Sequence, residues 1–449
     1  MKSLIHRGLV ILIAAVFVMA VVFPTASKVE AAEPSIDVKA PAAILVDADT
    51  GKILFEKNAD KLLEPASMSK MMTEYLIFKA IKKGQISWDT KVHISDYAYK
   101  VSQNYGLSNV PLRRDISYTV KQLFEAMEIE SANGAAIALA EEVAGTEKKF
   151  VQMMNQEADK LGLKNATFYN CTGLNNSDLY GHTPGGGPNS MNKMSARAVA
   201  KLAYDLISTF PEILQYSSIA KKKFTTGFPK NAPFQMKNWN WMLPSLVYGY
   251  KGVDGLKTGS TPKAGYSFTA TAKRGDMRLI SVVMDTDSYA ARFQQTKILL
   301  DFGFGHFEKT TLLNKGYAPK DKQSLPVTKG KTDKVSIASS QPITMMIQKG
   351  SKKQYKPKFT IDQSKLTKNG KLTAPVKKGT KVGKVEMVYK GGKSYGYLNG
   401  DGANNTSSPV VTTGEVQKAS WFTLMMRGIG GFFSGIWSNA ADMVKGLFS

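Results

Sequence analysis

The sequence predicts a mixed α/β domain, followed by a small all-β domain and a C-terminal amphipathic helix. Three observations predict this fold class. Strand-like segments lie at both ends of a long helical block, which is typical of one α/β unit whose terminal segments share a sheet. A lysine-rich region of short alternating segments comes next. The last segment then carries apolar residues at helical spacing.

The first segment, residues 1–31, has the features of a secretory signal peptide. Lys2 and Arg7 form a basic start, and the apolar run 8–23 is too short for a comfortable membrane span. A small-residue cleavage site follows at 29–31. An uncleaved N-terminal anchor is the alternative. In an exported protein the single cysteine, Cys171, forms no internal disulfide, so the core alone must hold the fold.

Length and charge limit the number of domains and the class of partner expected for the remaining chain. About 418 residues follow the cleavage site, enough for two domains or more, and the net charge falls from +24 to +22. Such an excess implies an anionic partner: nucleic acid, a membrane surface or an acidic polymer. Because an exported protein rarely meets nucleic acid, the last two are favoured. The expected parts are a signal peptide, the α/β domain, the β domain and the helix, at residues 1–31, 32–308, 309–415 and 416–449.

The elements of the α/β domain follow from hydrophobic periodicity and turn residues. Residues 43–47 and 52–56 predict a β-hairpin around 48–51. A helix follows Pro65 and ends at Lys83-Gly84. Further helices are predicted at 119–130, 135–143, 148–160, 195–208 and 288–302, and further strands at 253–259, 265–273 and 277–285. Between them, 170–192 is a long loop, which is either a functional rim or a tolerated surface insertion.

The two C-terminal parts differ sharply in composition. Residues 311–415 hold twenty Lys, no Arg, four Asp and two Glu in short strand-like segments. Lysine without arginine indicates diffuse electrostatic attraction, and a solubilising surface is the alternative. After a polar linker at 404–418, residues 419–449 form an apolar helical face that is interrupted by glycine and polar residues. This pattern predicts an interfacial helix lying on a membrane, with packing on the protein's own core as the alternative.

Ser67 and Lys70 are the first candidate catalytic residues. At spacing i, i+3 near a helix start they project from one face. A serine hydroxyl needs a base to take its proton, and a buried lysine loses its charge more easily. Taken alone, Ser-x-x-Lys is weak, because an N-capping serine followed by a solvated lysine gives the same pattern.

Two further motifs strengthen that interpretation. Ser131-Ala132-Asn133 is expected in a turn between helices, where its side chains can project into a cleft. Lys257-Thr258-Gly259 lies on an extended segment, and Gly259 leaves that strand bare, so a substrate can pair with its backbone. The four histidines are too scattered for a zinc site, and no metal or cofactor is expected.

The three motifs in this order, with the surroundings 65–73, 170–174 and 253–259, resemble those of the penicillin-recognising serine D,D-peptidases and β-lactamases. The match is closer to the low-molecular-weight penicillin-binding proteins, the D-alanyl-D-alanine carboxypeptidases. The resemblance implies a β-lactamase/transpeptidase-like catalytic domain, with an antiparallel sheet and a helical layer. It also implies action on peptidoglycan stem pentapeptides, acylation by penicillins, and a place on the outer face of the cytoplasmic membrane.

The resemblance implies acyl transfer through named residues. Ser67 attacks the carbonyl between two terminal D-alanines, Lys70 is the base, and Ser131 relays the proton to the leaving D-alanine. The backbone N–H groups of Ser67 and Ser260 form the oxyanion hole. Water then hydrolyses the acyl-enzyme.

Substrate binding is assigned in the same way. Asn133 holds the substrate amide. Lys257 and Thr258 bind the terminal carboxylate beside Gly259, which makes the enzyme an exopeptidase.

Two rival functions stay open. A class A β-lactamase needs a loop glutamate to activate the deacylating water, and 170–192 contains no Glu. A non-catalytic wall- or membrane-binding protein would depend on the lysines and the tail alone. The intact set of three motifs argues against it.

Overall fold

The structure is a computed structural model of the chain, and it describes residues 36–392, 394–400 and 406–427. The expected signal peptide and most of the expected C-terminal helix therefore lie outside the described residues.

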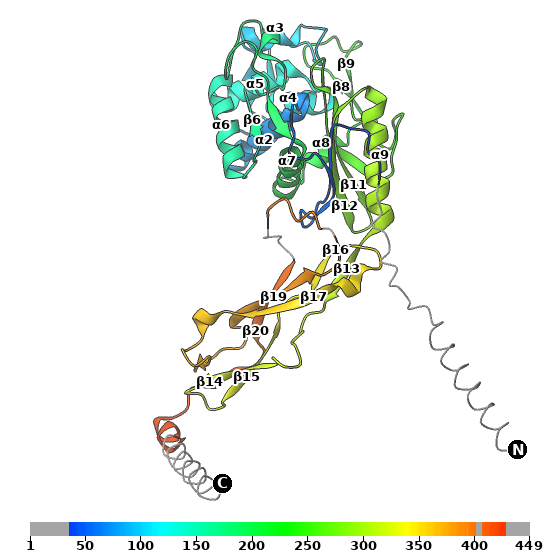
Figure 1. Cartoon of the computed structure of the whole chain (residues 1–449). Helices are drawn as coiled ribbons and strands as arrows, with labels where there is room; N and C mark the ends of the chain where they lie inside the picture. Colours follow the sequence, from blue (N-terminus) through cyan, green and yellow to red (C-terminus); the bar gives the residue numbers. More distant parts are fainter. Residues whose placement is uncertain (1–35, 393, 401–405, 428–449) are drawn as a thin grey trace, which may run out of the picture. The chain divides into compact units, whose positions relative to one another are not determined.

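A five-stranded antiparallel sheet forms the centre of the α/β domain, in the order β10-β11-β12-β1-β2 (Figure 1). Its strands are Ala42–Asp47 (β1), Ile53–Lys57 (β2), Val253–Thr261 (β10), Gly265–Arg274 (β11) and Met277–Thr286 (β12). β1 pairs with β12, so Ile44 lies opposite Val282. The expectation that the first and last strands share a sheet is confirmed.

Both faces of this sheet are covered, because successive side chains of a strand point to opposite faces. Ile44 and Val46 of β1 belong to the core shared with the helical layer. Leu45 points to the opposite face, close to Gly303 of α9 (Tyr289–His306), the last helix of the α/β domain. Figure 1 shows α9 and α7 on opposite sides of the sheet.

The helical layer contains every helix that the sequence predicts there: Lys70–Lys82 (α2), Val120–Ile129 (α4), Asn133–Ala144 (α5), Glu147–Lys160 (α6) and Ala196–Thr209 (α7). Caps explain where they begin. Thr119 and Gln122 form a capping box on α4, and the Ser195 hydroxyl caps α7. Helix α9 continues four residues beyond the predicted end at 302, through Gly303, because its bare Cα fits closely against Leu279 and Leu45.

Sequence periodicity missed the shorter elements. These are the helices Asp96–Ser102 (α3) and Ile213–Ser217 (α8), and the strands Leu62–Leu63 (β3), Lys91–His93 (β4), Ser117–Thr119 (β5), Ala166–Thr167 (β6), Lys193–Ser195 (β7), Lys221–Phe224 (β8) and Phe234–Lys237 (β9). Each is too short to show a clear period of its own.

The lysine-rich region folds as predicted into strands, with a six-stranded sheet in the order β17-β19-β20-β15-β14-β18 and a β13-β16 pair. The strands are Phe307–Leu313 (β13), Ser324–Thr328 (β14), Lys334–Ser339 (β15), Ile343–Gln348 (β16), Tyr355–Ile361 (β17), Leu372–Thr373 (β18), Lys381–Tyr389 (β19) and Ser407–Thr412 (β20). The predicted polar linker at 404–418 is wrong. β20 lies inside the sheet and buries Ser408, Val410 and Thr412 on one face, and Val416 is buried too, so this segment is part of the β domain.

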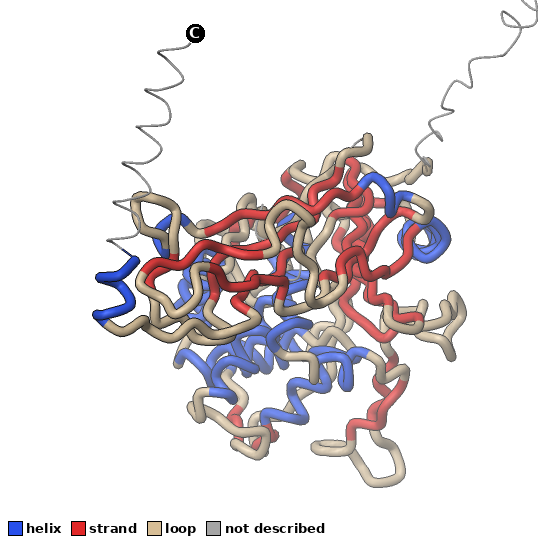
Figure 2. Tube along the Cα trace, turned by 90° about the horizontal axis from the view of Figure 1, so that it is seen from below, coloured by secondary structure: helices blue, strands red, loops and turns tan. Residues whose placement is uncertain are grey.

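Only the beginning of the predicted tail helix is described. Residues 421–427 are helical, and Figure 2 shows them in blue next to the grey trace. Four of their large apolar side chains are exposed: Trp421, Phe422, Met425 and Met426. Within the described residues, none of the helices combines the length and apolar character that crossing a bilayer requires.

Candidate active site

Ser67 lies in a short 3-10 turn, Ala66–Ser69 (η1), that runs directly into α2. Pro65 starts this turn, and Ala66 has a positive φ of 48°. The turn places Ser67 at the start of α2, where its side chain is half-buried. The Lys70 Nζ lies 3.0 Å from the Ser67 Oγ, so the two residues of the Ser-x-x-Lys motif are in contact.

Lys70 is fully buried, and its Nζ has three partners. It lies 2.7 Å from Asn133 Oδ1 and 2.8 Å from the carbonyl oxygen of Thr172, besides Ser67. A neutral amine has two N–H groups and one lone pair. It can therefore donate to the two carbonyl oxygens and accept the serine proton. Burial, with the charge of Lys257, lowers the pKa of Lys70 well below its usual value, which favours this neutral form.

The second motif lies beside that lysine. Asn133, predicted in the turn, is the first residue of α5, because this helix begins two residues earlier than predicted. Its Nδ2 donates to the carbonyl oxygen of Ser108 at 2.9 Å. Ser131 has a positive φ of 60°, and its buried hydroxyl has no hydrogen-bond partner among the described residues. Backbone strain of this kind is found preferentially at functional sites.

The third motif lies on β10, the edge strand of the sheet, so backbone groups on its free side point away from β11. Lys257 and Thr258 are buried, and Ser260 is half-buried. Burial lowers the pKa of the Lys257 ammonium. At Gly259 a Cβ would lie 2.4 Å from the Pro65 carbonyl oxygen. The glycine is therefore needed where β10 packs against the nucleophile turn, a different reason from the one predicted.

The loop after Asn170 is part of the same site. The Thr73 hydroxyl donates to the carbonyl oxygen of Cys171 at 2.8 Å, and the Thr172 carbonyl accepts from Lys70. Gly173 has a φ of 83°, and a Cβ there would lie 1.9 Å from the Ala66 carbonyl oxygen. Of the two interpretations of 170–192, the functional one applies to its first residues, because the Thr172 carbonyl is a hydrogen-bond partner of Lys70.

Arg292 is a candidate that the sequence reasoning missed. It is fully buried on α9, and its Nε and Nη2 have no hydrogen-bond partner among the described residues. Its Nη1 lies 3.5 Å from the Gly259 carbonyl oxygen. The rings of Tyr289 and Phe293 flank the guanidinium at 4.7 and 4.8 Å. A buried cation with free donors next to β10 can pair with a substrate carboxylate. In the sequence it is one arginine on a helix, with no local signal.

A pair of buried carboxyl groups was also missed. Glu74 lies one helical turn after Lys70 on α2, and Glu128 lies near the end of α4. Their carboxyl groups interact with each other. Glu74 Oε1 and both Glu128 oxygens have no hydrogen-bond partner among the described residues. Burial and the Glu128 carboxylate raise the pKa of Glu74 well above its usual value. We therefore describe Glu74 as protonated and Glu128 as the neighbouring carboxylate that disfavours its ionisation.

The described residues contain no group of three or more His, Cys, Asp or Glu that could hold a metal ion. What the site does contain is a nucleophile, a buried amine, a second hydroxyl and two cations. These groups suit nucleophilic transfer of an acyl group to the enzyme from a substrate that carries a carboxylate.

Comparisons with known protein families match two parts of the chain. A family described as D-alanyl-D-alanine carboxypeptidase, peptidase S11, matches residues 27–288. A second, described as the C-terminal domain of penicillin-binding protein 5, matches residues 307–418. Together they cover the α/β domain and the β domain.

Individual relatives match over most of their length. The chain is 33% identical to the D-alanyl-D-alanine carboxypeptidase DacF of Bacillus subtilis, over 87% of this chain and 90% of that protein. It is also 33% identical to the D-alanyl-D-alanine carboxypeptidase DacC of Escherichia coli, over 97% and 95%. Similarity over both chains nearly end to end indicates a common domain organisation.

Solved structures agree. The crystal structure of a peptidoglycan synthesis regulatory factor (PBP3) from Streptococcus pneumoniae has a TM-score of 0.69 and 34% identity, covering 85% of this chain and all of that one. Penicillin binding protein 5 from Haemophilus influenzae has a TM-score of 0.66 and 28% identity, covering 86% and 100%. The predicted catalytic fold followed by a β domain is confirmed.

Proposed function

The chain belongs to the peptidase S11 family of D-alanyl-D-alanine carboxypeptidases, and from that premise we propose how its residues carry out the reaction. It is a serine D,D-carboxypeptidase that removes the terminal D-alanine from peptidoglycan stem pentapeptides through an acyl-enzyme, and penicillins acylate it. The contact between the Ser67 hydroxyl and a buried Lys70 amine carries this assignment.

In the proposed acylation step, neutral Lys70 takes the proton of Ser67 as the oxygen attacks the carbonyl between the two D-alanines. The carbonyl oxygen becomes negative and is stabilised by the backbone N–H groups of Ser67 and Ser260, each typically worth about 3 kcal/mol. The Thr172 carbonyl and Asn133 Oδ1 hold the lysine in place through this step.

The leaving group then needs a proton and the carboxylate needs a counter-charge. Ser131 has a strained backbone, and its hydroxyl has no hydrogen-bond partner in the described part of the chain, so it suits a proton relay to the leaving nitrogen. Lys257 and Thr258, joined here by Arg292, bind the terminal carboxylate, which explains selection for a free C-terminus. Asn133 orients the substrate amide with its remaining Nδ2 hydrogen.

Deacylation returns the enzyme to its starting state. Water attacks the acyl carbonyl and its proton passes to Lys70, which then gives it to the Ser67 oxygen as the ester bond breaks. The class A β-lactamase alternative is not favoured, because 170–192 offers no glutamate to activate the water.

Labelling with a fluorescent penicillin tests the assignment. Wild-type protein should become covalently labelled and should release D-alanine from a D-Ala-D-Ala peptide, and Ser67→Ala should do neither while melting at a similar temperature. Labelling of the alanine variant at the wild-type rate would remove Ser67 from its role.

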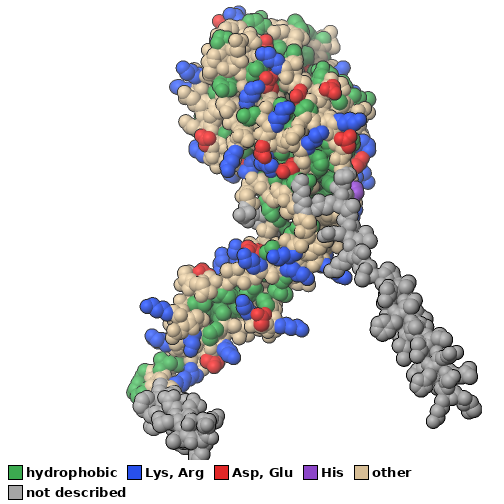
Figure 3. Space-filling view, in the orientation of Figure 1, with side chains coloured by type: hydrophobic (Ala, Val, Ile, Leu, Met, Phe, Trp, Pro, Cys, Tyr) green, Lys and Arg blue, Asp and Glu red, His purple; other side chains and the backbone are tan. Residues whose placement is uncertain are grey.

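Export and surface attachment complete the proposal. The signal-like segment 1–31 supports export to where peptidoglycan lies. Exposed apolar side chains at 421–427 support a peripheral anchor in the membrane–water interface. Figure 3 shows Lys and Arg side chains over the visible face of the β domain, which suits attraction to anionic lipid or wall polymer.

A further inference from the structure

A cavity of about 330 Å³ opens beside the catalytic residues and has no role in the mechanism above. Its walls come from the loop that follows α3, from the end of α4, from β9 and from the start of α9. At ~30 Å³ per water it has room for about ten waters. That is more than the methyl group of a terminal D-alanine requires.

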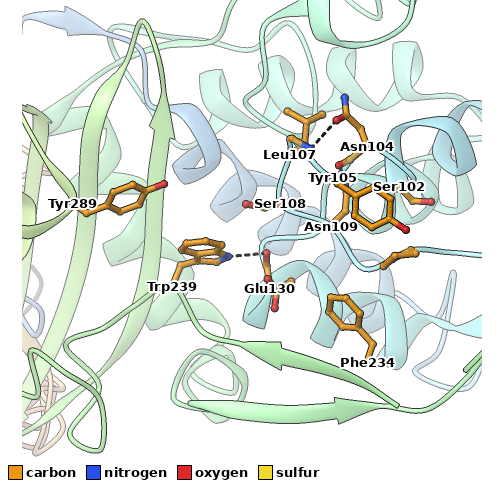
Figure 4. Close-up of a pocket in the computed structure, with 12 residues that line it drawn as sticks. Ser102, Asn104, Tyr105, Leu107, Ser108, Asn109, Glu130, Phe234, Trp239 and Tyr289 are labelled. Carbon is orange, nitrogen blue, oxygen red and sulfur yellow. Dashed lines mark hydrogen bonds between the residues drawn. The ribbon is translucent and has the colours of Figure 1, made fainter. Parts of the chain in front are cut away.

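The cavity has aromatic walls and a single charge. Figure 4 shows Trp239 on one side of Glu130 and Phe234 on the other. Trp239 is stacked with Tyr289 at 6.3 Å between ring centres, with an angle of 25° between the planes. Among the described residues that line the cavity, Glu130 is the one that carries a charge. In a protein of net charge +24, a cavity whose one charge is negative selects against anionic ligands.

The Glu130 carboxylate is held in place and can still accept further hydrogen bonds. Its Oε2 accepts the backbone N–H of Lys237 at 2.8 Å, and its main-chain carbonyl accepts the Trp239 indole N–H at 3.2 Å. A carboxylate has lone pairs for about four hydrogen bonds, so capacity is left for a ligand. An ammonium group on an alkyl stem would satisfy it, with aromatic faces beside the stem.

The cavity lies on the leaving-group side of the scissile bond. Glu130 directly precedes Ser131, the proposed donor to the leaving nitrogen. Burial raises the pKa of the Glu130 carboxyl group to about 7, and the nearby positive charge of Lys257 opposes this rise. A ligand ammonium group beside Glu130 would favour its charged form in the same way. Tyr289 lines the cavity, and its ring covers the Arg292 guanidinium at 4.7 Å. Lys257 and Arg292 are the proposed carboxylate ligands. A side chain on the C-terminal residue of the substrate would therefore be next to this cavity.

We propose that this cavity binds the side chain of the C-terminal residue of the substrate, and that Glu130 makes it selective for a D-residue with a side-chain ammonium group, such as D-lysine. This inference rests on the proposed function. The chemistry is the same hydrolysis: the bond between D-alanine and the terminal residue breaks, water supplies the hydroxyl of the new carboxylate, and a proton goes to the leaving amine.

Peptides that differ only in the terminal residue test the proposal. The wild-type kcat/KM should be about ten-fold higher for a D-Ala-D-Lys terminus than for the uncharged D-Ala-D-norleucine terminus. Glu130→Gln should abolish this ratio. Glu125→Gln, on the same helix but paired with Lys222, should keep it. The ratio of the two kcat/KM values is the readout, because Glu130 adjoins Ser131 and its substitution could change the rates on both peptides alike.

The outcomes separate the two claims. Equal rates for D-lysine and D-norleucine in the wild type, or a ratio unchanged in Glu130→Gln, would overturn the subsite. A Glu130-dependent preference for lysine over norleucine at the residue before D-Ala-D-Ala, without one at the terminus, would overturn it too, because the cavity would then hold the other end of the substrate. Absence of both D-Ala-D-Ala hydrolysis and penicillin labelling would contradict the proposed function itself.

Discussion

At the scale of single residues, the site depends on two buried basic side chains, Lys70 and Arg292, that differ in how easily they lose their proton. Burial and the charge of nearby Lys257 lower the pKa of Lys70, which makes its neutral form accessible. Arg292 keeps its charge, and two of its nitrogens have no hydrogen-bond partner among the described residues. The amine of Lys70 is thus suited to act as a base and the guanidinium of Arg292 to act as an anchor, because a buried lysine loses its proton much more easily than an arginine.

The Arg292 role predicts a change in specificity. Substrates amidated at the C-terminus should react more slowly than the free acids. Arg292→Gln should lower kcat/KM for the acid by about ten-fold to a hundred-fold, since a hydrogen bond to a charged group is worth roughly 1.5–3 kcal/mol. The rate on the amide should change little. Arg274→Gln, which removes a guanidinium stacked on Tyr250, is the control. Equal wild-type rates for acid and amide would exclude a carboxylate pocket.

The Glu74–Glu128 pair predicts a pH-dependent stability. Glu74 is protonated in the native state and ionises near pH 4.3 when unfolded, so folding takes up a proton. Wild-type stability should therefore fall, relative to Glu74→Gln, by about 1.4 kcal/mol per pH unit above that pKa until the native group ionises. Denaturant unfolding of both proteins between pH 4.5 and 8 measures this difference. Glu125→Gln is the control, and a difference independent of pH would show that Glu74 is ionised in the native protein.

At the scale of elements, the nucleophile turn is held between two backbones. β10 approaches it at Gly259, and the 170–174 loop approaches it at Gly173. Both contacts leave no room for a Cβ, so the position of Ser67 depends on segments far away in the sequence. The same loop supplies the Thr172 carbonyl to Lys70.

Gly173→Ala should therefore damage both stability and catalysis. The new Cβ would force the loop away from Ala66 and carry the Thr172 carbonyl with it, so we expect penicillin acylation at least ten-fold slower and a lower Tm. Gly181→Ala is a matched control, because Gly181 also has a positive φ, 87°, but open space around it. It should lower stability by about 1 kcal/mol through φ alone. Equal acylation rates in the two variants would mean that the close packing at Gly173 does not position the base.

At the scale of the whole molecule, the catalytic domain and the membrane attachment should be separable. Deleting 419–449 should release a soluble enzyme that still cleaves a short peptide, because the site residues all lie between 67 and 292. Sedimentation with anionic vesicles at low and high salt, beside a peptide assay, measures both properties. If the truncated protein still sediments at high salt, the anchor lies elsewhere. If it loses activity on the short peptide, the tail belongs to the catalytic fold.

The sequence by itself determined the order of the long elements, the domain sequence and the three motifs. Helical and strand periods, caps and glycines are local signals, and Ser67 with Lys70 are only three residues apart. The resemblance of those motifs, in their order and with their surroundings, to the D-alanyl-D-alanine carboxypeptidases predicted the family.

Only the tertiary structure decided the rest. It brought Thr172 to Lys70, paired Glu74 with Glu128, placed Arg292 beside Gly259 and opened the cavity at Glu130. It also placed residues 407–412 of the predicted linker in a strand of the β domain. Each of these depends on contacts between residues distant in the chain. A local sequence pattern does not indicate such contacts, because the residue that buries a side chain or forms a hydrogen bond with it is determined only when the elements pack together.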